Sequence, residues 1–301
     1  MDVPIMTTLS LILLVTVMDP TGLVLSMPSS GNNPAGRSIE GLRHIKHYLE
    51  RFGYLSHTNS RHNNTTNVDD HDHNHDEDVF DDILVSAIKK FQLNYGLPVT
   101  GEPDIRTTNQ MSKPRCGVPD NDAHNNFTAN GYHTDYKLMP GRMRWHKTKL
   151  RYKFLSSSLF PEVNYRGAVY RALRTWGRAT EFRFKKQGSA SAAELKIGFF
   201  SGKHGDGIPF DGPGKVLGHT FSPPVGITHF DADEPWTCSG RPGPERLDLE
   251  SVALHELGHA LGLDHSSDER AVMYPYFSYG LTKRKLYRDD IEGIRTLYGL
   301  P

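Results

Sequence analysis

The chain has 301 residues, of which 37% are hydrophobic and 23% are charged, as in soluble globular proteins, and this length fits one or two domains. Lysine plus arginine and aspartate plus glutamate both number 35, so the formal net charge is zero. This balance argues against a nucleic-acid partner and against a basic membrane-binding surface.

The chain begins with an apolar run over residues 5–18. The run is short for a membrane span but suits the apolar core of a secretory signal, and small residues near Ser26 offer a cleavage site. We therefore predict a signal peptide over residues 1–26, with an uncleaved anchor as the alternative because the usual positive charge before the run is missing. No later segment approaches membrane length, so no stable membrane anchor is expected. Glycosylation sequons at Asn63, Asn64 and Asn126 agree with export.

Two segments with apolar residues at helical spacing predict a small helical domain within residues 27–135. The first covers residues 39–52. The second covers residues 83–93 and is ended by Gly96 and Pro98.

The stretch between these helices, residues 59–82, is polar and rich in histidine and aspartate. It has too little apolar surface to offset the entropy lost on ordering, so we predict a disordered insert. Its alternating His71, His73 and His75 could hold a metal loosely, but a solvated charged run is the simpler interpretation.

The helical domain ends near residues 114–120, which read PRCGVPD and contain Cys116, one of only two cysteines. Two prolines stiffen this exposed-looking turn, and a thiolate is a strong zinc ligand, so the cysteine suits a metal that has one free position. A disulfide with Cys238 is the alternative in an exported chain. It would close a loop of about 120 residues and leave the PRCGVPD pattern unexplained.

Residues 136–301 are predicted to form a second domain that mixes strands and helices. They lack a strict alternation of strand and helix, which favours a sheet packed on helices over a doubly wound fold. The predicted fold class is therefore α+β. Strands are expected at 150–154, 182–186, 195–200 and 215–221, and helices at 161–179, 250–261 and 289–297.

The most informative stretch reads HELGHALGLDH. On a helix, His255 and His259 share one face, so both imidazoles can bind a zinc ion at about 2.1 Å, with Glu256 beside them. A continuous helix would carry His265 about 15 Å along the axis from His255, too far to share the metal. The helix must therefore end, and Gly262 is suited to the positive φ that such an ending needs.

Three neutral imidazoles with an open fourth position describe a catalytic zinc rather than a closed structural one. The bare HExxH pattern also occurs by chance on ordinary helices, so the extended motif matters. Met273 follows His265 by eight residues, which matches the methionine turn that lies beneath the histidines in metzincins.

A glycine-rich region upstream carries two further sets of candidate ligands. A second, structural zinc suits the first set, which is His204, Asp206, His219 and His229. Calcium prefers hard oxygen ligands and suits the second set, which is Asp211, Asp231 and Glu234. The alternatives are a solvated loop with scattered histidines and ordinary surface carboxylates.

Taken in order, these motifs resemble the matrixins, or matrix metalloproteinases. PRCGVPD resembles their cysteine switch, HELGHALGLDH their zinc motif, AVMYP their Met-turn and HGDGIPFDGPG their metal-bearing loop. The resemblance covers about residues 83–298 and looks closest to the short, plant-type members without a C-terminal propeller domain. It implies a metzincin-type catalytic domain, with a mixed twisted sheet and about three helices, after a helical propeptide.

The resemblance also implies roles for individual residues. The Cys116 thiolate would occupy the open position on the catalytic zinc, so that the chain is a latent zymogen, and Arg115 and Asp120 would clamp the turn as an ion pair. At least one calcium would bind the three carboxylates and the carbonyl groups of Gly212, Gly214 and Val216. Ile227 stands where an aspartate usually binds a further calcium, so we do not predict that ion.

We therefore predict a secreted zinc endopeptidase that acts on extracellular proteins of the matrix or cell wall, after an activating protease cuts between residues 130 and 142. Water would replace the thiolate, and Glu256 would take its proton during attack on the peptide carbonyl and pass it to the leaving amine. The substrate is expected beside an edge strand at 215–221, with Pro275 and Phe277 in the wall of the specificity pocket. The competing class is a binding protein that hydrolyses nothing and uses its helical domain, which resembles a peptidoglycan-binding module.

Overall fold

The computed structural model describes residues 41–55, 79–120, 134–155 and 165–300. The predicted signal peptide, the three sequons and most of the predicted insert lie outside these ranges. Within them, no helix combines the length and apolar character that crossing a membrane requires.

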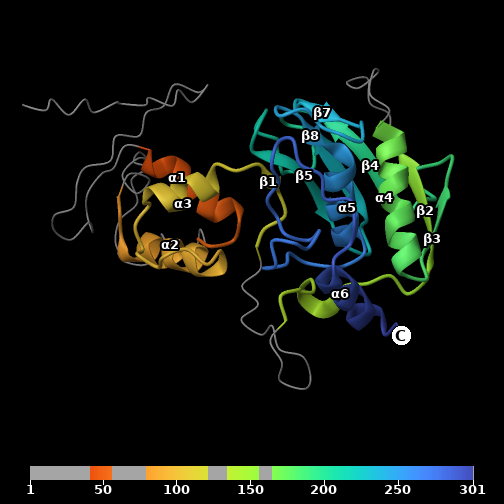
Figure 1. Cartoon of the computed structure of the whole chain (residues 1–301), viewed down its shortest axis with the longest axis horizontal. Helices are drawn as coiled ribbons and strands as arrows, with labels where there is room; N and C mark the ends of the chain where they lie inside the picture. Colours follow the sequence, from red (N-terminus) through yellow and green to blue (C-terminus); the bar gives the residue numbers. More distant parts are fainter. Residues whose placement is uncertain (1–40, 56–78, 121–133, 156–164, 301) are drawn as a thin grey trace, which may run out of the picture.

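The first part of the described chain is a group of three helices (Figure 1). They are α1 (Leu42–Arg51), α2 (Asp82–Asn94) and α3 (Ile105–Met111). The first two were predicted within a few residues, whereas α3 was not. Its start is fixed by Asp104, whose side chain accepts a hydrogen bond from the Thr107 backbone nitrogen at 2.8 Å. Ile105 at its first position is exposed, so this short helix lacks the apolar periodicity on which the prediction depended.

The predicted insert extends too far at its C-terminal end. Phe80 is fully buried, and the Asp81 side chain caps α2 by accepting a hydrogen bond from the Leu84 backbone nitrogen at 2.8 Å. One aromatic side chain and one capping aspartate are therefore enough to order residues 79–82, although the segment before them is polar.

The helical domain packs directly on the rest of the chain. Its core is rich in aromatic rings, with Phe91 in edge contact with Tyr48 and Tyr54 at centroid distances of 5.7 and 5.4 Å. Phe210 and Val216, which belong to the second domain, are buried in the same cluster. The two units therefore share a continuous apolar contact.

The second domain is built on a six-stranded sheet with the order β1-β5-β6-β4-β2-β3. Only the β5–β6 pair is antiparallel, so the predicted mixed sheet is confirmed. The strands are β1 (Arg115–Cys116), β2 (Lys149–Phe154), β3 (Arg183–Lys186), β4 (Leu195–Phe200), β5 (Val216–Phe221) and β6 (Ile227–Asp231). A small second sheet pairs β7 (Trp236–Thr237) with β8 (Leu247–Asp248).

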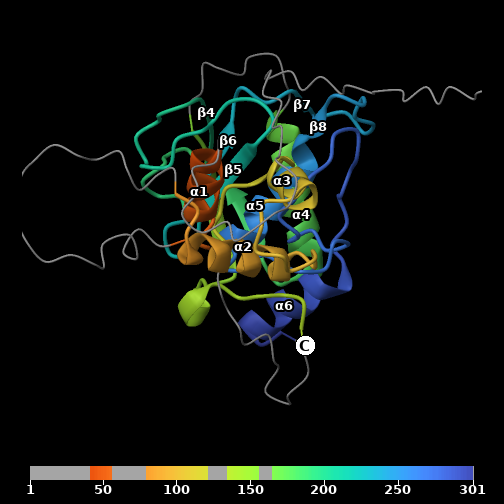
Figure 2. The same cartoon turned by 90° about the vertical axis from the view of Figure 1, so that its left-hand side faces the viewer.

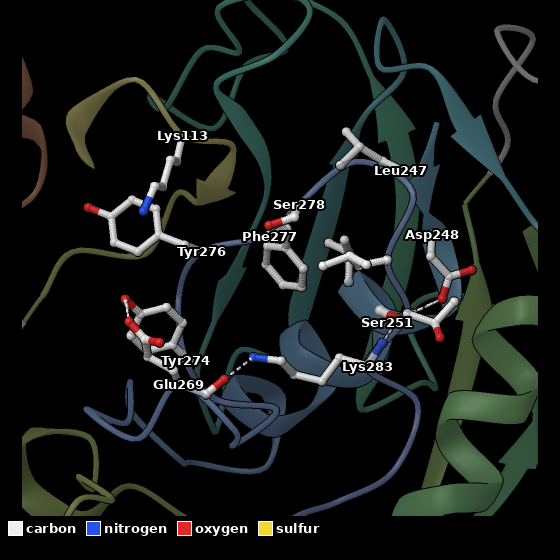
Figure 3. A pocket seen from close by; sticks show the side chains of 13 residues that line it. Lys113, Leu247, Asp248, Ser251, Glu269, Tyr274, Tyr276, Phe277, Ser278 and Lys283 are labelled. Atoms are coloured by element: carbon white, nitrogen blue, oxygen red, sulfur yellow. Dashed lines mark hydrogen bonds between the residues drawn. The ribbon is translucent and has the colours of Figure 1, made fainter. Parts of the chain in front are cut away.

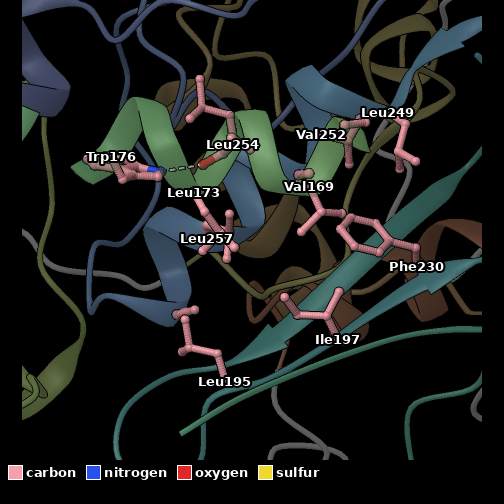
Figure 4. Packing of buried hydrophobic residues seen from close by; sticks show 14 of the residues in the cluster. Val169, Leu173, Trp176, Leu195, Ile197, Phe230, Leu249, Val252, Leu254 and Leu257 are labelled. Carbon is pink, nitrogen blue, oxygen red and sulfur yellow. Dashed lines mark hydrogen bonds between the residues drawn. The ribbon is translucent and has the colours of Figure 1, made fainter. Parts of the chain in front are cut away.

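Three helices complete this domain, as predicted: α4 (Tyr165–Ala179), α5 (Leu249–Ala260) and α6 (Arg288–Tyr298). A 3-10 turn, η2 (Pro140–Arg142), precedes β2. Figure 4 shows apolar side chains of α4 and α5 packed against each other and against β4 and β6. Trp176 lies at this contact and donates its indole hydrogen to the Leu254 carbonyl oxygen at 2.8 Å. The buried helix α5 is thus held rigidly between α4 and the sheet.

Two expectations about the sheet edge need correction. β5 was predicted as the edge strand, but β1 pairs with it in parallel, with Arg115 opposite Val216 and Cys116 opposite Gly218. The PRCGVPD segment was expected to be an exposed turn, yet Cys116 is fully buried within β1. Figure 2 looks onto the helical domain, with β5 and α5 behind it. The edge of β5 is therefore covered by the chain's own cysteine segment.

Candidate metal centre

The helix α5 and the turn after it position the predicted triad. Asp248 caps the helix by accepting a hydrogen bond from the Ser251 backbone nitrogen at 3.1 Å. The helix ends at Ala260, and Gly262 follows with a φ of 102°. A side chain at this glycine would overlap the Met143 carbonyl oxygen, so both the conformation and the space require glycine. The predicted ending of the helix is confirmed.

The chain reversal brings the three histidines together. The ring centroids of His255, His259 and His265 are 4.7 to 5.3 Å apart, and all three side chains are buried. The Nε2 atoms of His255 and His259 lie 3.1 Å from each other. The sequence prediction of a shared site is therefore correct in its geometry.

The protonation of these rings follows from their other nitrogens. The Nδ1 atoms of His255 and His259 lie 2.8 Å from the carbonyl oxygens of Val272 and Leu263, which can only accept, so both Nδ1 atoms carry hydrogen. Burial lowers the pKa of both imidazoles well below the usual value, which keeps them neutral. Their Nε2 atoms are then unprotonated, and two lone pairs face each other. Such an arrangement is repulsive unless a cation lies between them, so these residues fit a metal ion.

Cys116 closes the fourth side of the group. Its sulfur lies 3.4 Å from the His259 Nε2, and all four candidate ligand atoms lie within 4.8 Å of one another. The Cys116 backbone nitrogen donates to the Pro275 carbonyl oxygen at 2.9 Å, and the next amide, from Gly117, donates to Gly218 at 2.7 Å. Both cysteines of the chain are free, so the alternative disulfide with Cys238 does not form.

Asp120 links the cysteine segment to the triad through five hydrogen bonds. Its carboxylate accepts two from Arg115 at 2.8 and 3.1 Å, one each from the hydroxyls of Tyr54 and Tyr95 at 2.7 and 2.6 Å, and one from His265 Nδ1 at 2.8 Å. Burial opposes ionisation, but the Arg115 charge and the His265 hydrogen bond hold the pKa of Asp120 well below its usual range. The expected ion pair with Arg115 is confirmed, while the three other partners were not predicted.

Replacing Asp120 with asparagine should loosen the latent form. An amide would direct donor hydrogens at the donors of Arg115 and the tyrosines, and would leave a buried guanidinium without its counter-charge, which costs about 3–5 kcal/mol. We expect full-length Asp120→Asn to convert to a shorter active form much faster than the unmodified chain, as followed by gel electrophoresis and hydrolysis of a quenched peptide. Tyr54→Phe removes one hydroxyl donor but keeps the ion pair, so its effect should be smaller. Equal latency of all three chains would contradict this role.

Glu256 lies on the same helix with its carboxylate buried beside the triad. One oxygen accepts a hydrogen bond from the Thr220 hydroxyl at 2.8 Å, and the other, Oε1, has no partner within the described part of the chain. Burial raises the pKa of Glu256 to about 7. A carboxylate with one anchored and one free oxygen is suited to accept a proton. Thr220 lies on β5, and no sequence pattern connected it with Glu256.

Met273, the predicted Met-turn residue, contacts helix α5 at Gly258, next to His259. Its side chain packs against Gly258, where any larger residue would overlap the Met273 sulfur. The backbone nitrogens of Val272 and Met273 both donate to the Asp290 carboxylate, at 2.9 and 3.0 Å. The methionine turn is thereby fixed to helix α6.

The second predicted histidine group also converges. His204 Nε2, His219 Nε2 and His229 Nδ1 lie 2.7 to 2.8 Å from a single carboxylate oxygen of Asp206. The His204 Nδ1 is bonded to the Gly202 carbonyl oxygen at 2.8 Å, so its Nε2 directs a lone pair at that oxygen. Burial lowers the pKa of His219 to about 4. A carboxylate oxygen that faces three imidazole nitrogens, at least one of them unprotonated, fits a bound cation. The histidines therefore form a cluster and are not scattered over a solvated loop.

The predicted calcium ligands form a separate acidic group. Asp231 and Glu234 are buried, and each has a carboxylate oxygen without a hydrogen-bond partner among the described residues. The Asp211 carboxylate accepts a hydrogen bond from the Val216 backbone nitrogen at 3.1 Å, and Glu234 accepts one from Gly214 at 2.7 Å. Buried carboxylate oxygens without partners fit a cation better than they fit ordinary surface carboxylates.

A cavity of about 310 Å³ lies near the triad, because the ring centroid of its lining residue Phe277 is 5.4 Å from that of His255 (Figure 3). Phe277 lines it, as predicted, but Pro275 is not among its lining residues. Lys283 reaches across one side, where its ammonium group donates to the carbonyl oxygens of Glu269 and Ala271 at 2.8 and 2.9 Å. Lys113 of the helical domain contributes to the opposite side. The cavity therefore has an aromatic wall and a cationic border.

The chain is a zinc metalloendopeptidase, because a glutamate lies next to three converging histidines on a buried helix and the turn after it. The helical domain that precedes the catalytic domain is its propeptide. Comparison with known proteins identifies the family. The Matrixin family model matches residues 144–299, and a model of a peptidoglycan binding domain matches residues 38–111. The chain belongs to the matrixin family.

Similar proteins occur in plants and animals. The chain is 43% identical over 272 residues to Metalloendoproteinase 1 of Glycine max, covering 88% of this chain and 84% of that protein. It is 42% identical over 278 residues to Metalloendoproteinase 5-MMP of Arabidopsis thaliana, covering 88% and 72%. Human Matrilysin is 39% identical over 221 residues, covering 72% of this chain and 77% of its own length.

Proposed function

We propose that this matrixin is a secreted endopeptidase made as a latent zymogen, which hydrolyses peptide bonds of extracellular proteins. The observation that carries the proposal is the convergence of three histidines on the Cys116 sulfur, with the free carboxylate oxygen of Glu256 beside them. We assign residues 1–26 to a signal peptide, 27–135 to the propeptide and 136–301 to the catalytic domain. The last boundary is supported by the Lys137 carbonyl oxygen, which accepts a hydrogen bond from the Asp264 backbone nitrogen next to the triad.

His255, His259 and His265 would hold the catalytic zinc, and Cys116 would be its fourth ligand in the latent form. When bound, zinc lowers the pKa of a bound water to near 7 and polarises the substrate carbonyl. Hydrogen bonds from the Nδ1 atoms of His255 and His259 to backbone carbonyl groups of the catalytic domain fix these two rings, and Asp120 of the propeptide fixes the ring of His265 in the latent form.

Glu256 is the proposed general base. Its free Oε1 would take a proton from the attacking water, while the Thr220 hydroxyl holds Oε2 and so fixes the direction of the carboxylate. The protonated Glu256 would then deliver this proton to the nitrogen of the leaving amine as the peptide bond breaks. Its raised pKa, about 7, suits a group that must both accept and release a proton near neutrality.

The substrate is proposed to lie along β5, on the edge that β1 covers in this structure. Removal of the propeptide would expose the backbone groups of β5 and allow an extended peptide to add to the sheet. The side chain that follows the cleaved bond would enter the cavity lined by Phe277.

A second zinc is proposed at His204, Asp206, His219 and His229, and a calcium ion at Asp211, Asp231 and Glu234 with the carbonyl groups of Gly212, Gly214 and Val216. The proposed ligands lie on the segment that leads into β5, on β5 and β6 themselves, or, for Glu234, just after β6. Their metals would therefore stabilise the strand beside which the substrate binds.

The calcium proposal predicts a pH dependence of stability. Burial raises the pKa of Asp231 from 3.8 to about 6 and that of Glu234 from 4.5 to about 8. Between the unfolded and folded pKa values of each group, the folded chain binds more protons than the unfolded chain. The contribution of these two carboxyl groups to stability is therefore full at low pH and is lost as the pH rises towards 8. In calcium-free buffer that contains zinc, we expect the Tm to fall by several degrees between pH 5 and pH 8.

Added calcium should remove this decline, because the bound ion balances the negative charge of the two carboxylates once they have lost their protons. Glu234→Gln should weaken the pH dependence and also the response to calcium. Identical Tm profiles with and without calcium would contradict the proposed site.

The proposed activity is tested on the purified full-length chain. We expect two zinc ions per chain by metal analysis, and hydrolysis of casein or a quenched peptide only after a mercurial treatment that displaces the thiol. A strong chelator should abolish the hydrolysis, and zinc with calcium should restore it. A precursor that contains no zinc would overturn the proposal.

A second candidate function is polysaccharide binding by the helical domain. It is favoured by the match of residues 38–111 to a peptidoglycan binding domain. Retention on insoluble cell-wall polysaccharide by a chain that hydrolyses no peptide after mercurial treatment would support this function instead.

A further inference from the structure

A row of cationic side chains covers one corner of the large sheet, on the face that points away from the helices. On β2, Leu150, Tyr152 and Phe154 point into the core, so the residues between them point outward. The outward side chains of β2, β3 and β4 at this corner are Lys149, Arg151, Lys153, Arg183, Lys185 and Lys196.

The strand register sets these cations directly opposite one another. Lys149 faces Arg183 and Arg151 faces Lys185 across β2 and β3, and Lys153 faces Lys196 across β2 and β4. Like charges in directly opposed positions destabilise a sheet, and an acidic or neutral residue in either position would relieve the repulsion. Three such pairs side by side therefore reduce the stability of the fold.

Compensation by acidic residues is limited. The Glu194 carboxylate pairs with Arg151 and with Lys147, both at 2.7 Å. The other five cations of the row have no ion pair within the described ranges. Because the whole chain has a net charge of zero, this corner is a local excess of positive charge that the composition conceals.

Protection of the sheet edge explains only part of the row. β3 is the last strand of the sheet, and lysine or arginine on an edge strand discourages pairing with other chains. That reason applies to Arg183 and Lys185. Lys149, Lys153 and Lys196 lie on β2 and β4, which already have a neighbour on both sides, so their charges need another explanation.

We infer that this face, the cationic sheet face, binds a linear acidic polysaccharide. Strands about 4.8 Å apart, with outward side chains about 6.7 Å apart along each strand, present a flat and regular array of charges. Such an array suits a long polymer with repeated carboxylates or sulfates. The inference rests on the proposed export of the chain, which would bring it into contact with matrix or cell-wall polymers.

The position of the face agrees with such a role. In Figure 1, β2 and β3 lie at the opposite end of the molecule from helices α1–α3. β1 and β5, which border the candidate active site, form the other edge of the sheet. A polymer bound at β2–β4 would therefore not cover the active site, which removal of the propeptide could still open.

A membrane surface fits this face less well. Membrane-binding surfaces usually combine cations with apolar side chains that insert between lipids. None of the large hydrophobic side chains that are exposed within the described ranges belongs to β2, β3 or β4. The cationic sheet face thus offers charge without an apolar anchor.

The test compares three full-length chains at low and moderate salt. The first is unmodified, the second carries Lys149→Ser, Lys153→Ser and Lys196→Ser, and the third is a charge-matched control with Arg174→Ser, Arg241→Ser and Lys285→Ser. The control positions are exposed and lie outside the large sheet. Binding is measured to heparin, which carries sulfates and carboxylates, and to polygalacturonate, which carries carboxylates alone.

We expect the unmodified chain and the control to bind alike, and the sheet variant to bind about tenfold more weakly or worse. The salt dependence of binding should also fall by about one counterion for each cation removed, as it does for nucleic-acid ligands. The Tm of the sheet variant should be unchanged or higher, because two of the three repulsive pairs, Lys149–Arg183 and Lys153–Lys196, are relieved. A preference for heparin over polygalacturonate would identify sulfate as the main anion, and the reverse would identify carboxylate.

An equal loss of binding in the control, or no binding of the unmodified chain to either polymer, would overturn the inference. So would binding to anionic vesicles or to DNA by the same lysines without binding to the polysaccharides. Failure of the proposed function is recognised separately, because hydrolysis of a small soluble peptide by the activated enzyme does not depend on the cationic sheet face.

Discussion

Replacing Glu256 with glutamine is expected to lower kcat/KM of the activated enzyme by about a thousandfold on a quenched peptide. General acid–base catalysis by a positioned side chain typically contributes factors of about 10² to 10⁴. Glutamine has nearly the same shape and can keep the hydrogen bond from Thr220, but its amide cannot take a proton from water. The loss should therefore appear in kcat, with little change in zinc content or Tm.

Two further variants make this result specific. Glu292→Gln changes an exposed glutamate on α6 that forms a surface pair with Arg288 at 2.6 Å, so activity should stay at the unmodified level. Thr220→Val removes the hydroxyl that fixes the Glu256 carboxylate, and a loss of several-fold is expected because the base remains but is less well oriented. If Glu256→Gln kept most of the activity while its zinc was retained, the proton would have to move by another route.

The residues that sequence reasoning located are those that local geometry determines. His255 and His259 share a helix face whatever the rest of the fold is. Gly262 allows the positive φ with which the chain turns, so that His265 comes back next to them. Strands β2 to β5 and all described α-helices except α3 were also located, since alternating and helical apolar patterns survive without tertiary information, whereas β6 was not predicted. These features depend on contacts within about one or two turns of the chain.

The contacts that the sequence did not reveal join residues that are distant in the chain, either across the two domains or between a strand and a helix of the second domain. The hydrogen bond from His265 to Asp120 spans 145 positions, and that from Thr220 to Glu256 spans 36. β1 has only two residues, too few for a strand pattern, and it forms because β5 offers free backbone groups. The net charge did not reveal the cationic sheet face either. It sums the charges of the whole chain, whereas the strand register brings cations together at one corner of the sheet.

Replacing Cys116 with serine should abolish latency in the full-length chain. Apparent zinc binding energies of about 10–16 kcal/mol for four ligands correspond to about 3 kcal/mol per ligand, so loss of the sulfur should favour the open form by about 100-fold. β1 and the Asp120 network remain in this variant, so the propeptide should leave the site only part of the time. Open molecules would then cut the propeptides of others, and the preparation should convert to a shorter active form without mercurial or added protease.

The second cysteine provides a matched control. Cys238 is free and half-buried, and neither candidate metal group includes it, so Cys238→Ser should remain as latent as the unmodified chain. Adding Glu256→Gln to Cys116→Ser should stop the conversion, because the chain then lacks the base with which it cuts itself. Conversion that continued in this double variant would point to a contaminating protease. A Cys116→Ser chain that stayed intact and inactive would mean that pairing of β1 with β5 and the buried Arg115–Asp120 ion pair are sufficient for latency, and that the sulfur is not what keeps water from the metal.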